Sequence, residues 1–369
     1  MLLINNPIQS TFIFIAILAV IFLLSLRRRT DSGLSLSAST ELKGLAILAI
    51  VFSHVGYFLV SDTRFLFPLS SFAGVGVDIF LFLSGFGLAV SQLRNNYSPL
   101  QFYKQRLVKL LLPFWLILIL FFSLDALFLQ SHYSWSYIFR SFLGFFPQAD
   151  LYHDINSPLW YFTFILFCYL IFPLVFSKKK PYLSAVAIYV ALCAFWQLSV
   201  VFLPNVAHLY RLHTVAFPLG VLIAGILQNE KISLMMKNSA WLNKVFSVRS
   251  WWHYLAQLFL LSVFCFTIYR SGVGHGPFLE QGVGLISMAA IVGFFAIKDF
   301  SVKLFYIVGA YSYEIYLLHW PIMYHYDFLF KYIPSWLAMA LYIFVFIAFG
   351  LALQEASGFI VKKINLKSK

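Results

Sequence analysis

The stretch Glu41-Leu-Lys-Gly-Leu-Ala-Ile-Leu-Ala-Ile-Val-Phe-Ser-His54 predicts a hydrophobic helix with a cation near its start and one histidine deep inside it. Lys43 and His54 are 11 positions apart, which at about 100° per residue puts both side chains on one helix face. His54 would lie about 16 Å along the axis from Lys43, halfway through a hydrocarbon core of about 30 Å. An ionisable side chain at that depth favours a function, as a general base or a proton relay. A histidine that is merely hydrogen-bonded within a helix bundle is the structural alternative.

The rest of the chain has the composition of an integral membrane protein. It has 369 residues, of which 62% are hydrophobic and 11% charged, whereas soluble domains carry about 25% charged residues. The net charge of +13 suggests nucleic acid, but the basic residues fall in short clusters between apolar runs, which indicates membrane topology and no nucleic-acid partner. The three cysteines, Cys168, Cys193 and Cys265, lie in apolar runs, so neither a disulfide framework nor a metal site is expected.

Apolar runs of membrane-spanning length predict an all-α, polytopic bundle of about 11 transmembrane helices. These runs cover residues 11–26, 43–60, 72–92, 107–129, 158–177, 183–203, 213–228, 253–270, 281–297, 303–323 and 335–357. The first run is followed by Arg27–Arg29 and by no small-residue cleavage site, so residues 1–40 are expected to be a transmembrane anchor with a basic cytoplasmic linker. Residues 41–369 are then the main membrane domain.

The basic residues also predict the orientation. With the N-terminus outside and the C-terminus in the cytoplasm, few of the 26 Lys and Arg fall in outer segments: Arg64, Arg140, Arg211, Arg270 and Lys331. This asymmetry fits the positive-inside rule. We therefore expect a multi-pass protein of the plasma or inner membrane, whose Lys43 faces the cytoplasm.

Two segments in the first third of the chain carry small or basic residues. Gly74-Val-Gly-Val-Asp-Ile-Phe-Leu-Phe-Leu-Ser-Gly-Phe86 contains glycines and a serine that allow close helix packing. Packing does not explain its Asp78, for which simple solvation near the outer end is the alternative to a function. Arg106 and Lys109 lie three residues apart at the cytoplasmic boundary and suit the binding of phosphates. The alternative is that both charges set the topology and reach lipid headgroups.

The last third of the chain contains Gly309-Ala-Tyr-Ser-Tyr-Glu-Ile-Tyr-Leu-Leu-His-Trp-Pro321. Its Ser312, Tyr316 and His319 share one helix face. Glu314 points elsewhere, but a carboxylate within a span favours function over packing. On an unbroken helix His319 lies about 24 Å beyond Lys303, near the outer surface, where a partly hydrated interfacial histidine is the alternative. Trp160 lies at the start of the span that follows an outer loop, and an aromatic belt at the membrane interface explains it without any function.

Four of these stretches together resemble the acyltransferase-3 family of membrane-bound acyltransferases. The similar stretches, over about residues 41–355, are Lys43-x10-His54 (basic residue-x10-His), Phe80-Leu-Phe-Leu-Ser-Gly-Phe86 (Phe-rich Ser-Gly-Phe), Arg106-x-x-Lys109 followed by Pro113 (Arg-x-x-Arg), and Ser312-Tyr313-x-x-Tyr316-Leu-x-His319-x-Pro321 (the late helix). Lys43 and Lys109 stand where the family often has arginine, so a point charge replaces a bidentate fork. The 11–26 span precedes the usual ten-helix core.

The resemblance implies transfer of an acyl group, most often acetyl, from cytoplasmic acetyl-CoA to a hydroxyl of a cell-surface or lipid-linked carbohydrate. The implied partners are acyl-CoA as co-substrate, the carbohydrate acceptor and the lipid bilayer, with no bound cofactor. The residues that the resemblance and the pattern single out are His54, Lys43 and Glu314 for catalysis, Arg106, Lys109 and Ser84 for acyl-CoA, and Trp160, Ser312, Tyr316 and His319 for the acceptor.

Two other classes of membrane protein stay open at this point. A polysaccharide exporter or flippase of lipid-linked saccharides would also be basic and polytopic, but it needs neither a histidine at mid-depth nor acyl-CoA. A proton-coupled transporter would explain buried His54 and Glu314, yet the sequence has no recognisable inverted repeat or paired broken helices.

Overall fold

The computed structural model describes residues 2–29, 31, 33–95, 97–151, 153–248, 250–271 and 276–367. Arg249 and Lys369, which the charge asymmetry assigns to the cytoplasm, lie outside these residues. The helices are α1 (Pro7–Leu24), α2 (Leu36–His54), α3 (Ala73–Asn95), α4 (Pro99–Leu124), α5 (Trp135–Phe142), α6 (Trp160–Val175), α7 (Pro181–Phe202), α8 (Pro204–His213), α9 (Ala216–Leu227), α10 (Glu230–Asn238), α11 (Ala240–Phe246), α12 (Trp251–Ile268), α13 (Pro277–Ile297), α14 (Lys303–Ala310), α15 (Ser312–Tyr324) and α16 (Ser335–Lys367). Two three-residue strands, β1 (Leu26–Arg28) and β2 (Phe300–Val302), pair antiparallel.

The helices confirm the predicted all-α, polytopic bundle. Within the described residues, 10 helices are long and apolar enough to cross a membrane, and α8 with α9 counts as one of them. The remaining predicted span, 303–323, is not one continuous helix. It divides at Tyr311 into α14 and α15, which follow each other end to end and are each shorter than a membrane span. The division of the chain at residue 40 stays a prediction.

Glycines let the central helices approach at backbone distance. A Cβ on Gly85 of α3 would overlap the carbonyl group of Phe217 on α9, and a Cβ on Gly220 of α9 would overlap the carbonyl group of Phe82. Small residues are the usual means of close helix packing in membranes, where lipid supplies no hydrophobic drive for helices to associate. The expected packing role of the small residues in the 74–86 segment is therefore confirmed at Gly85.

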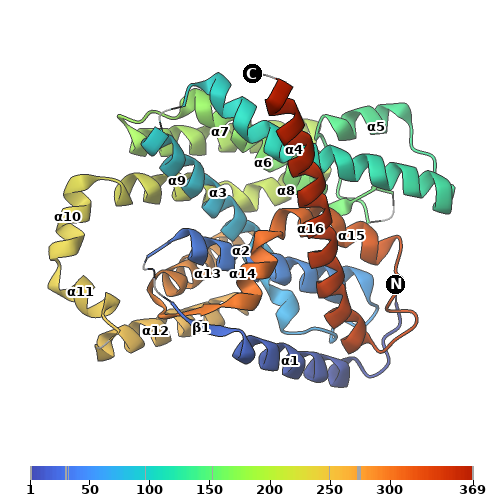
Figure 1. The fold of residues 1–369 in the computed structure, drawn as a ribbon, viewed down its shortest axis with the longest axis horizontal. Helices are drawn as coiled ribbons and strands as arrows, with labels where there is room; N and C mark the ends of the chain where they lie inside the picture. The colour runs from blue at the N-terminus through green and yellow to red at the C-terminus, as the bar shows by residue number, and fades with distance from the viewer. Residues whose placement is uncertain are drawn as a thin grey trace.

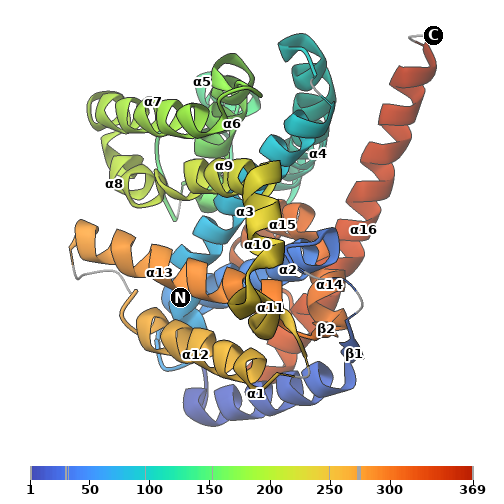
Figure 2. The same cartoon turned by 90° about the vertical axis from the view of Figure 1, so that its left-hand side faces the viewer.

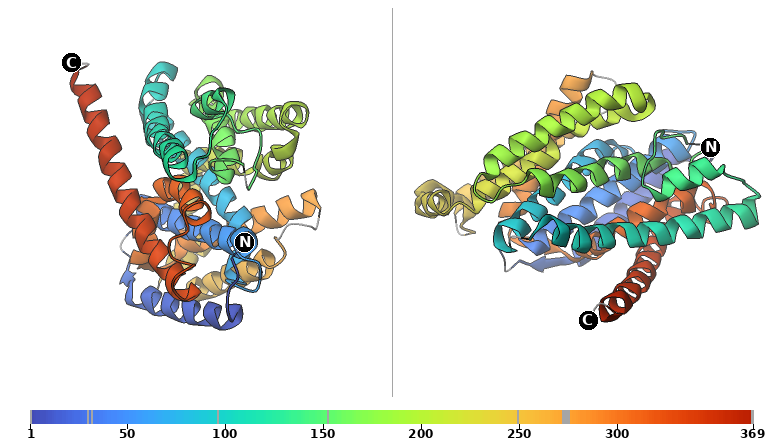
Figure 3. Two further views of the ribbon diagram at one scale, coloured as in Figure 1. Left: turned by 90° about the vertical axis from the view of Figure 1, so that its right-hand side faces the viewer. Right: turned by 90° about the horizontal axis from the view of Figure 1, so that it is seen from above.

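Helices α2 and α3 lie in the middle of the molecule (Figure 1), with α1 and α12 on one side and α6 and α7 on the other, as the turned view in Figure 2 also shows. Helix α16 crosses the bundle, and its C-terminal end projects away from the other helices (Figure 3). In the span Leu36–Leu59, which contains α2, 72% of the most apolar 18-residue stretch is buried, the highest share among the candidate spans. A helix surrounded in this way can hold polar side chains away from lipid.

A buried ion pair fixes the start of α2. Glu41 accepts hydrogen bonds from Lys298 Nζ at 2.6 Å and from the backbone N–H of Val302 at 2.9 Å. Both Glu41 and Lys298 are almost fully buried, so each charge depends on the other for compensation. The pair ties α2 to the turn before β2, and it leaves Glu41 unavailable to neutralise Lys43.

Candidate active site

A cavity of about 980 Å³ opens beside α2 and is lined by side chains from α2, α3, α4, α6, α8, α13 and α15. Most of the site residues predicted from sequence face it: Lys43, His54, Ser84, Arg106, Lys109, Trp160, Ser312 and Tyr316. They come from five helices that are far apart in the chain. The cavity therefore joins the segments that the sequence motifs single out.

His54 meets His319 directly. His54 Nδ1 lies 2.8 Å from His319 Nε2, and the two rings are nearly parallel, at 9°. On its other side, His319 Nδ1 lies 2.9 Å from the carbonyl oxygen of Tyr316 and 3.1 Å from that of Ile315. Since a carbonyl oxygen only accepts hydrogen bonds, His319 Nδ1 carries the proton. In the neutral pair His319 Nε2 then accepts from His54 Nδ1–H, which leaves the lone pair of His54 Nε2 for the cavity.

His319 is not the partly hydrated interfacial histidine that the sequence allows. An unbroken helix from Lys303 would carry it about 24 Å along the axis, to the outer surface and to water. Because the helix is interrupted at Tyr311, α15 follows its own course, and His319 is fully buried behind His54. His319 does not line the cavity, so its contact with the site runs through His54.

The surroundings of His54 are aromatic. The Trp320 ring stands perpendicular to the His54 ring with centroids 5.4 Å apart, and the Phe58 ring lies 5.9 Å away. A π-helical turn, Val55–Leu59, begins directly after His54. Such turns inside helices are frequent at functional sites, because they redirect side chains locally.

One part of the cavity wall is cationic. Lys43, Arg106 and Lys109 all line it, and they are half-buried, half-buried and exposed, respectively. Arg106 Nη2 donates to Ser91 Oγ at 3.0 Å, which fixes the guanidinium. Among the described residues, the ion pairs involve none of these three cations. The geometry leaves their charges available for an anionic ligand.

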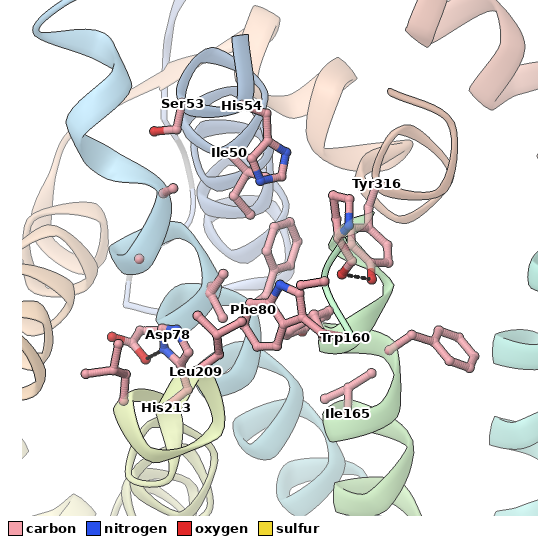
Figure 4. Close-up of a pocket in the computed structure, with 18 of the residues that line it drawn as sticks. Ile50, Ser53, His54, Asp78, Phe80, Trp160, Ile165, Leu209, His213 and Tyr316 are labelled. Carbon is pink, nitrogen blue, oxygen red and sulfur yellow. Dashed lines mark hydrogen bonds and ion pairs between the residues drawn. The ribbon is translucent and has the colours of Figure 1, made fainter. Parts of the chain in front are cut away.

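The middle of the cavity is aromatic and hydroxylated. Tyr316 donates its hydroxyl hydrogen to the carbonyl oxygen of Pro158 at 2.9 Å, which ties α15 to the turn before α6. Tyr161 packs edge-on against Tyr316, and Trp160 packs edge-on against Tyr161. Figure 4 shows Trp160 and Tyr316 in this part of the cavity. Trp160 is thus part of the cavity wall, and an aromatic belt facing lipid does not account for it.

Asp78 and His213 form a second polar centre that sequence reasoning missed. His213 Nδ1 lies 2.7 Å from Asp78 Oδ1, and the two residues are 5% and 3% exposed. The alternative that Asp78 is simply solvated is therefore wrong. Its only sequence signal is a carboxylate inside an apolar span, and nothing along the chain links it to His213, 135 residues later.

Glu314 does not join this site. It is buried, but it does not line the cavity, and its Cβ lies 3.5 Å from where a Cβ on Gly350 of α16 would stand.

The described residues contain no cluster of three or more His, Cys, Asp or Glu able to hold a metal ion.

Comparison with known proteins gives one match. The model of the acyltransferase-3 family, described as an acyltransferase domain, matches residues 41–355. No curated protein and no solved structure matches the chain. The matched range includes every cavity residue discussed above and most of the chain. The chain therefore belongs to the acyltransferase-3 family and is a multi-pass membrane acyltransferase.

Proposed function

We propose that the protein transfers an acyl group, acetyl in the first instance, from cytoplasmic acyl-CoA to a hydroxyl of a cell-surface or lipid-linked carbohydrate. One observation carries this proposal. A single cavity is lined both by His54, whose Nε2 faces it, and by three cations that have no ion-pair partner among the described residues. Cations suit the phosphates of coenzyme A, and a histidine nitrogen suits the activation of a hydroxyl.

The donor enters from the side of Lys43, Arg106 and Lys109 in this proposal. Their charges hold the phosphates, and the narrow pantetheine arm carries the thioester along the cavity toward His54. Ser84 also lines the cavity, where its hydroxyl can contact the arm. The absence of an ion-pair partner for these cations among the described residues supports this assignment.

The chemical step uses His54 as a general base. His54 Nε2 removes the proton from the acceptor hydroxyl while the hydroxyl oxygen attacks the thioester carbonyl carbon. The tetrahedral intermediate collapses, the carbon–sulfur bond breaks, and the proton on His54 Nε2 passes to the leaving thiolate of CoA. While His54 is an imidazolium, its Nδ1–H continues to donate to His319 Nε2. His319 is therefore a positioning residue, and Glu314, outside the cavity, takes no part.

An acyl relay uses the same atoms in a different order. His54 Nε2 attacks the thioester carbonyl carbon, the carbon–sulfur bond breaks, and CoA leaves as the thiolate, which gives an acyl-imidazolium that keeps its Nδ1–H. The acceptor hydroxyl then attacks the acyl carbon, the carbon–nitrogen bond breaks, and the hydroxyl proton passes to the CoA thiolate, so His54 returns to its neutral form. Both routes need an unprotonated His54 Nε2, so the hydrogen-bond chain through His319 supports either.

The experiment uses inside-out membrane vesicles from cells that make the protein, supplied with radiolabelled acetyl-CoA. We expect label in the carbohydrate of the vesicles and release of CoA in equal amount, above vesicles without the protein. An exporter or flippase would give no acetyl-CoA-dependent label. A proton-coupled transporter would acidify or alkalinise proteoliposomes containing a pH-sensitive dye, without any label transfer.

A further inference from the structure

We propose that Asp78 and His213 form the acceptor-binding centre of the cavity, where His213 Nε2 accepts a hydrogen bond from a hydroxyl of the carbohydrate that is not itself acylated. This inference rests on the proposed function and extends it, because it assigns a role to two residues outside the family-like motifs. Its consequence is that Asp78 and His213 determine which hydroxyl reaches His54.

The pair leaves one nitrogen of His213 free in a defined state. Asp78 as a carboxylate only accepts hydrogen bonds, so His213 Nδ1 carries a proton, and in the neutral imidazole Nε2 keeps its lone pair. Trp160 stacks on the His213 ring with centroids 5.9 Å apart and planes at 19°, which fixes the orientation of the ring. A fixed acceptor nitrogen beside a cavity is suited to a hydroxyl donor.

Three helices build the pair. Asp78 belongs to α3 and His213 ends α8, while Gly284 of α13 lies so near that an added Cβ would stand 3.3 Å from Asp78 Oδ2. All three residues line the cavity. Burying a carboxylate and an imidazole together is costly even when they pair, and replacing such a pair by apolar residues is often neutral for stability. A polar pair that also faces a cavity is therefore better explained by a ligand than by helix packing alone.

The position of the pair separates it from the reacting centre. Figure 4 shows Asp78 and His213 pointing toward each other at the lower left of the view, with His54 at the top and Phe80 and Trp160 near the centre. A sugar ring carries hydroxyls on several carbons, so one hydroxyl can contact His213 while another lies at His54. A ligand with a single hydroxyl cannot do both.

The walls near His213 also suit a neutral, hydroxylated ligand. Asn205 and His208 of α8 and Gln281 of α13 line this part of the cavity, and Gln281 is held by hydrogen bonds to Arg211 O and Thr214 Oγ1. The lysines and arginine that line the cavity belong to α2 and α4. Glu280 of α13 also lines the cavity, and amide, imidazole and carboxylate groups suit hydroxyls rather than phosphates.

The test compares His213→Gln and Asp78→Asn with His253→Gln. His253 is a matched control, because it is a buried histidine held by the carbonyl oxygen of Val245 and by Gln257, and it does not line the cavity. Each protein is assayed for transfer of radiolabelled acetyl in the vesicles above, for binding of acetyl-CoA after purification, and for thermal stability. Mass spectrometry of the vesicle carbohydrate gives the position acylated.

We expect His213→Gln to lower transfer by about 10- to 100-fold, Asp78→Asn by about 10-fold, and both to spread the remaining acyl group over more than one hydroxyl. Loss of one partner of a buried pair also lowers thermal stability, so transfer is compared at equal amounts of folded protein. Acetyl-CoA binding should stay within about twofold of wild type, and His253→Gln should keep wild-type transfer and position. Wild-type rate and position in both cavity variants would overturn the inference. So would a parallel loss of acetyl-CoA binding and stability, which marks a structural crosslink. Wild-type protein without any transfer would instead refute the proposed function.

Discussion

The hydrogen-bond chain from the backbone of α15 through His319 to His54 determines which nitrogen of His54 faces the cavity. The carbonyl oxygen of Tyr316 can only accept, so His319 Nδ1 donates to it, and in the neutral pair His54 Nδ1 then donates to His319 Nε2. A base that is held in one tautomer needs no rearrangement before it takes a proton. The same logic applies to Asp78 and His213 across the cavity, where a carboxylate replaces the second histidine.

Replacing His319 tests this chain. His319→Ala removes the acceptor for His54 Nδ1–H, so both tautomers of His54 become populated and its ring loses its anchor. We expect kcat to fall by about 10- to 100-fold, with the KM for acetyl-CoA changed little, because a lost hydrogen bond to a buried group is worth about 1–3 kcal/mol. His319→Gln, whose amide oxygen can accept the same bond, should recover part of the rate. An unchanged kcat in His319→Ala would show that His54 acts without this partner.

The cations at the donor side make a separate prediction. Arg106→Gln removes a charge that lines the cavity, so the KM for acetyl-CoA should rise by about 10-fold or more with a smaller effect on kcat. Lys104 is the matched control, since it lies on the same helix, is exposed and does not line the cavity. Equal KM values for Arg106→Gln and Lys104→Gln, measured by initial rates in vesicles, would argue that Arg106 serves topology alone.

At the level of helices, α2 and α14 touch through their backbones. A Cβ on Gly309 of α14 would overlap the carbonyl group of Thr40, and one on Gly44 of α2 would overlap that of Phe305. This contact holds the end of α14 against α2, directly before the start of α15, which carries His319.

Gly309→Ala should destabilise the protein by about 1–3 kcal/mol, because the clashing atoms belong to the backbone and cannot swing aside. Gly87→Ala on α3 is the control, since a Cβ there meets nothing within 4 Å, and alanine favours a helix by up to about 1 kcal/mol over glycine. Thermal unfolding in detergent compares the two. A Gly309→Ala protein as stable as Gly87→Ala would contradict the close contact.

The sequence predicts the helices well and their contacts poorly, for a physical reason. Lipid requires long apolar runs with every backbone group satisfied internally, so hydropathy alone locates most spans. The break at Tyr311 has no proline beside it that would predict it. The pairing of His54 with His319 joins residues 265 apart, and that of Asp78 with His213 joins residues 135 apart. Such contacts form only in the tertiary fold, and the pattern of apolar residues along a single sequence does not specify them.

At the scale of the whole molecule, function depends on orientation. The charge asymmetry predicts that the loop before α5 is outside and the turn between α6 and α7 is inside. In a cysteine-free background, Ser131→Cys should react with an impermeant maleimide in intact cells, and Lys179→Cys only after permeabilisation; both positions are exposed. The reverse labelling pattern would put Lys43, Arg106 and Lys109 on the side that lacks acyl-CoA and would contradict the proposed route of the donor.

The cavity organises the molecule around one transfer step. Cations of α2 and α4, His54 of α2 and the Asp78–His213 pair all line it, so donor and acceptor can meet without leaving the bundle. Both proposed routes of acyl transfer use Nε2 of His54.

The most direct measurement is acetyl transfer by purified His54→Ala in proteoliposomes that contain the vesicle carbohydrate, with equal amounts of folded wild-type protein beside it. The account predicts that transfer falls by about 100- to 10,000-fold, the usual contribution of a positioned base or nucleophile, while acetyl-CoA binding persists. Near-normal transfer by the His54→Ala protein would contradict it.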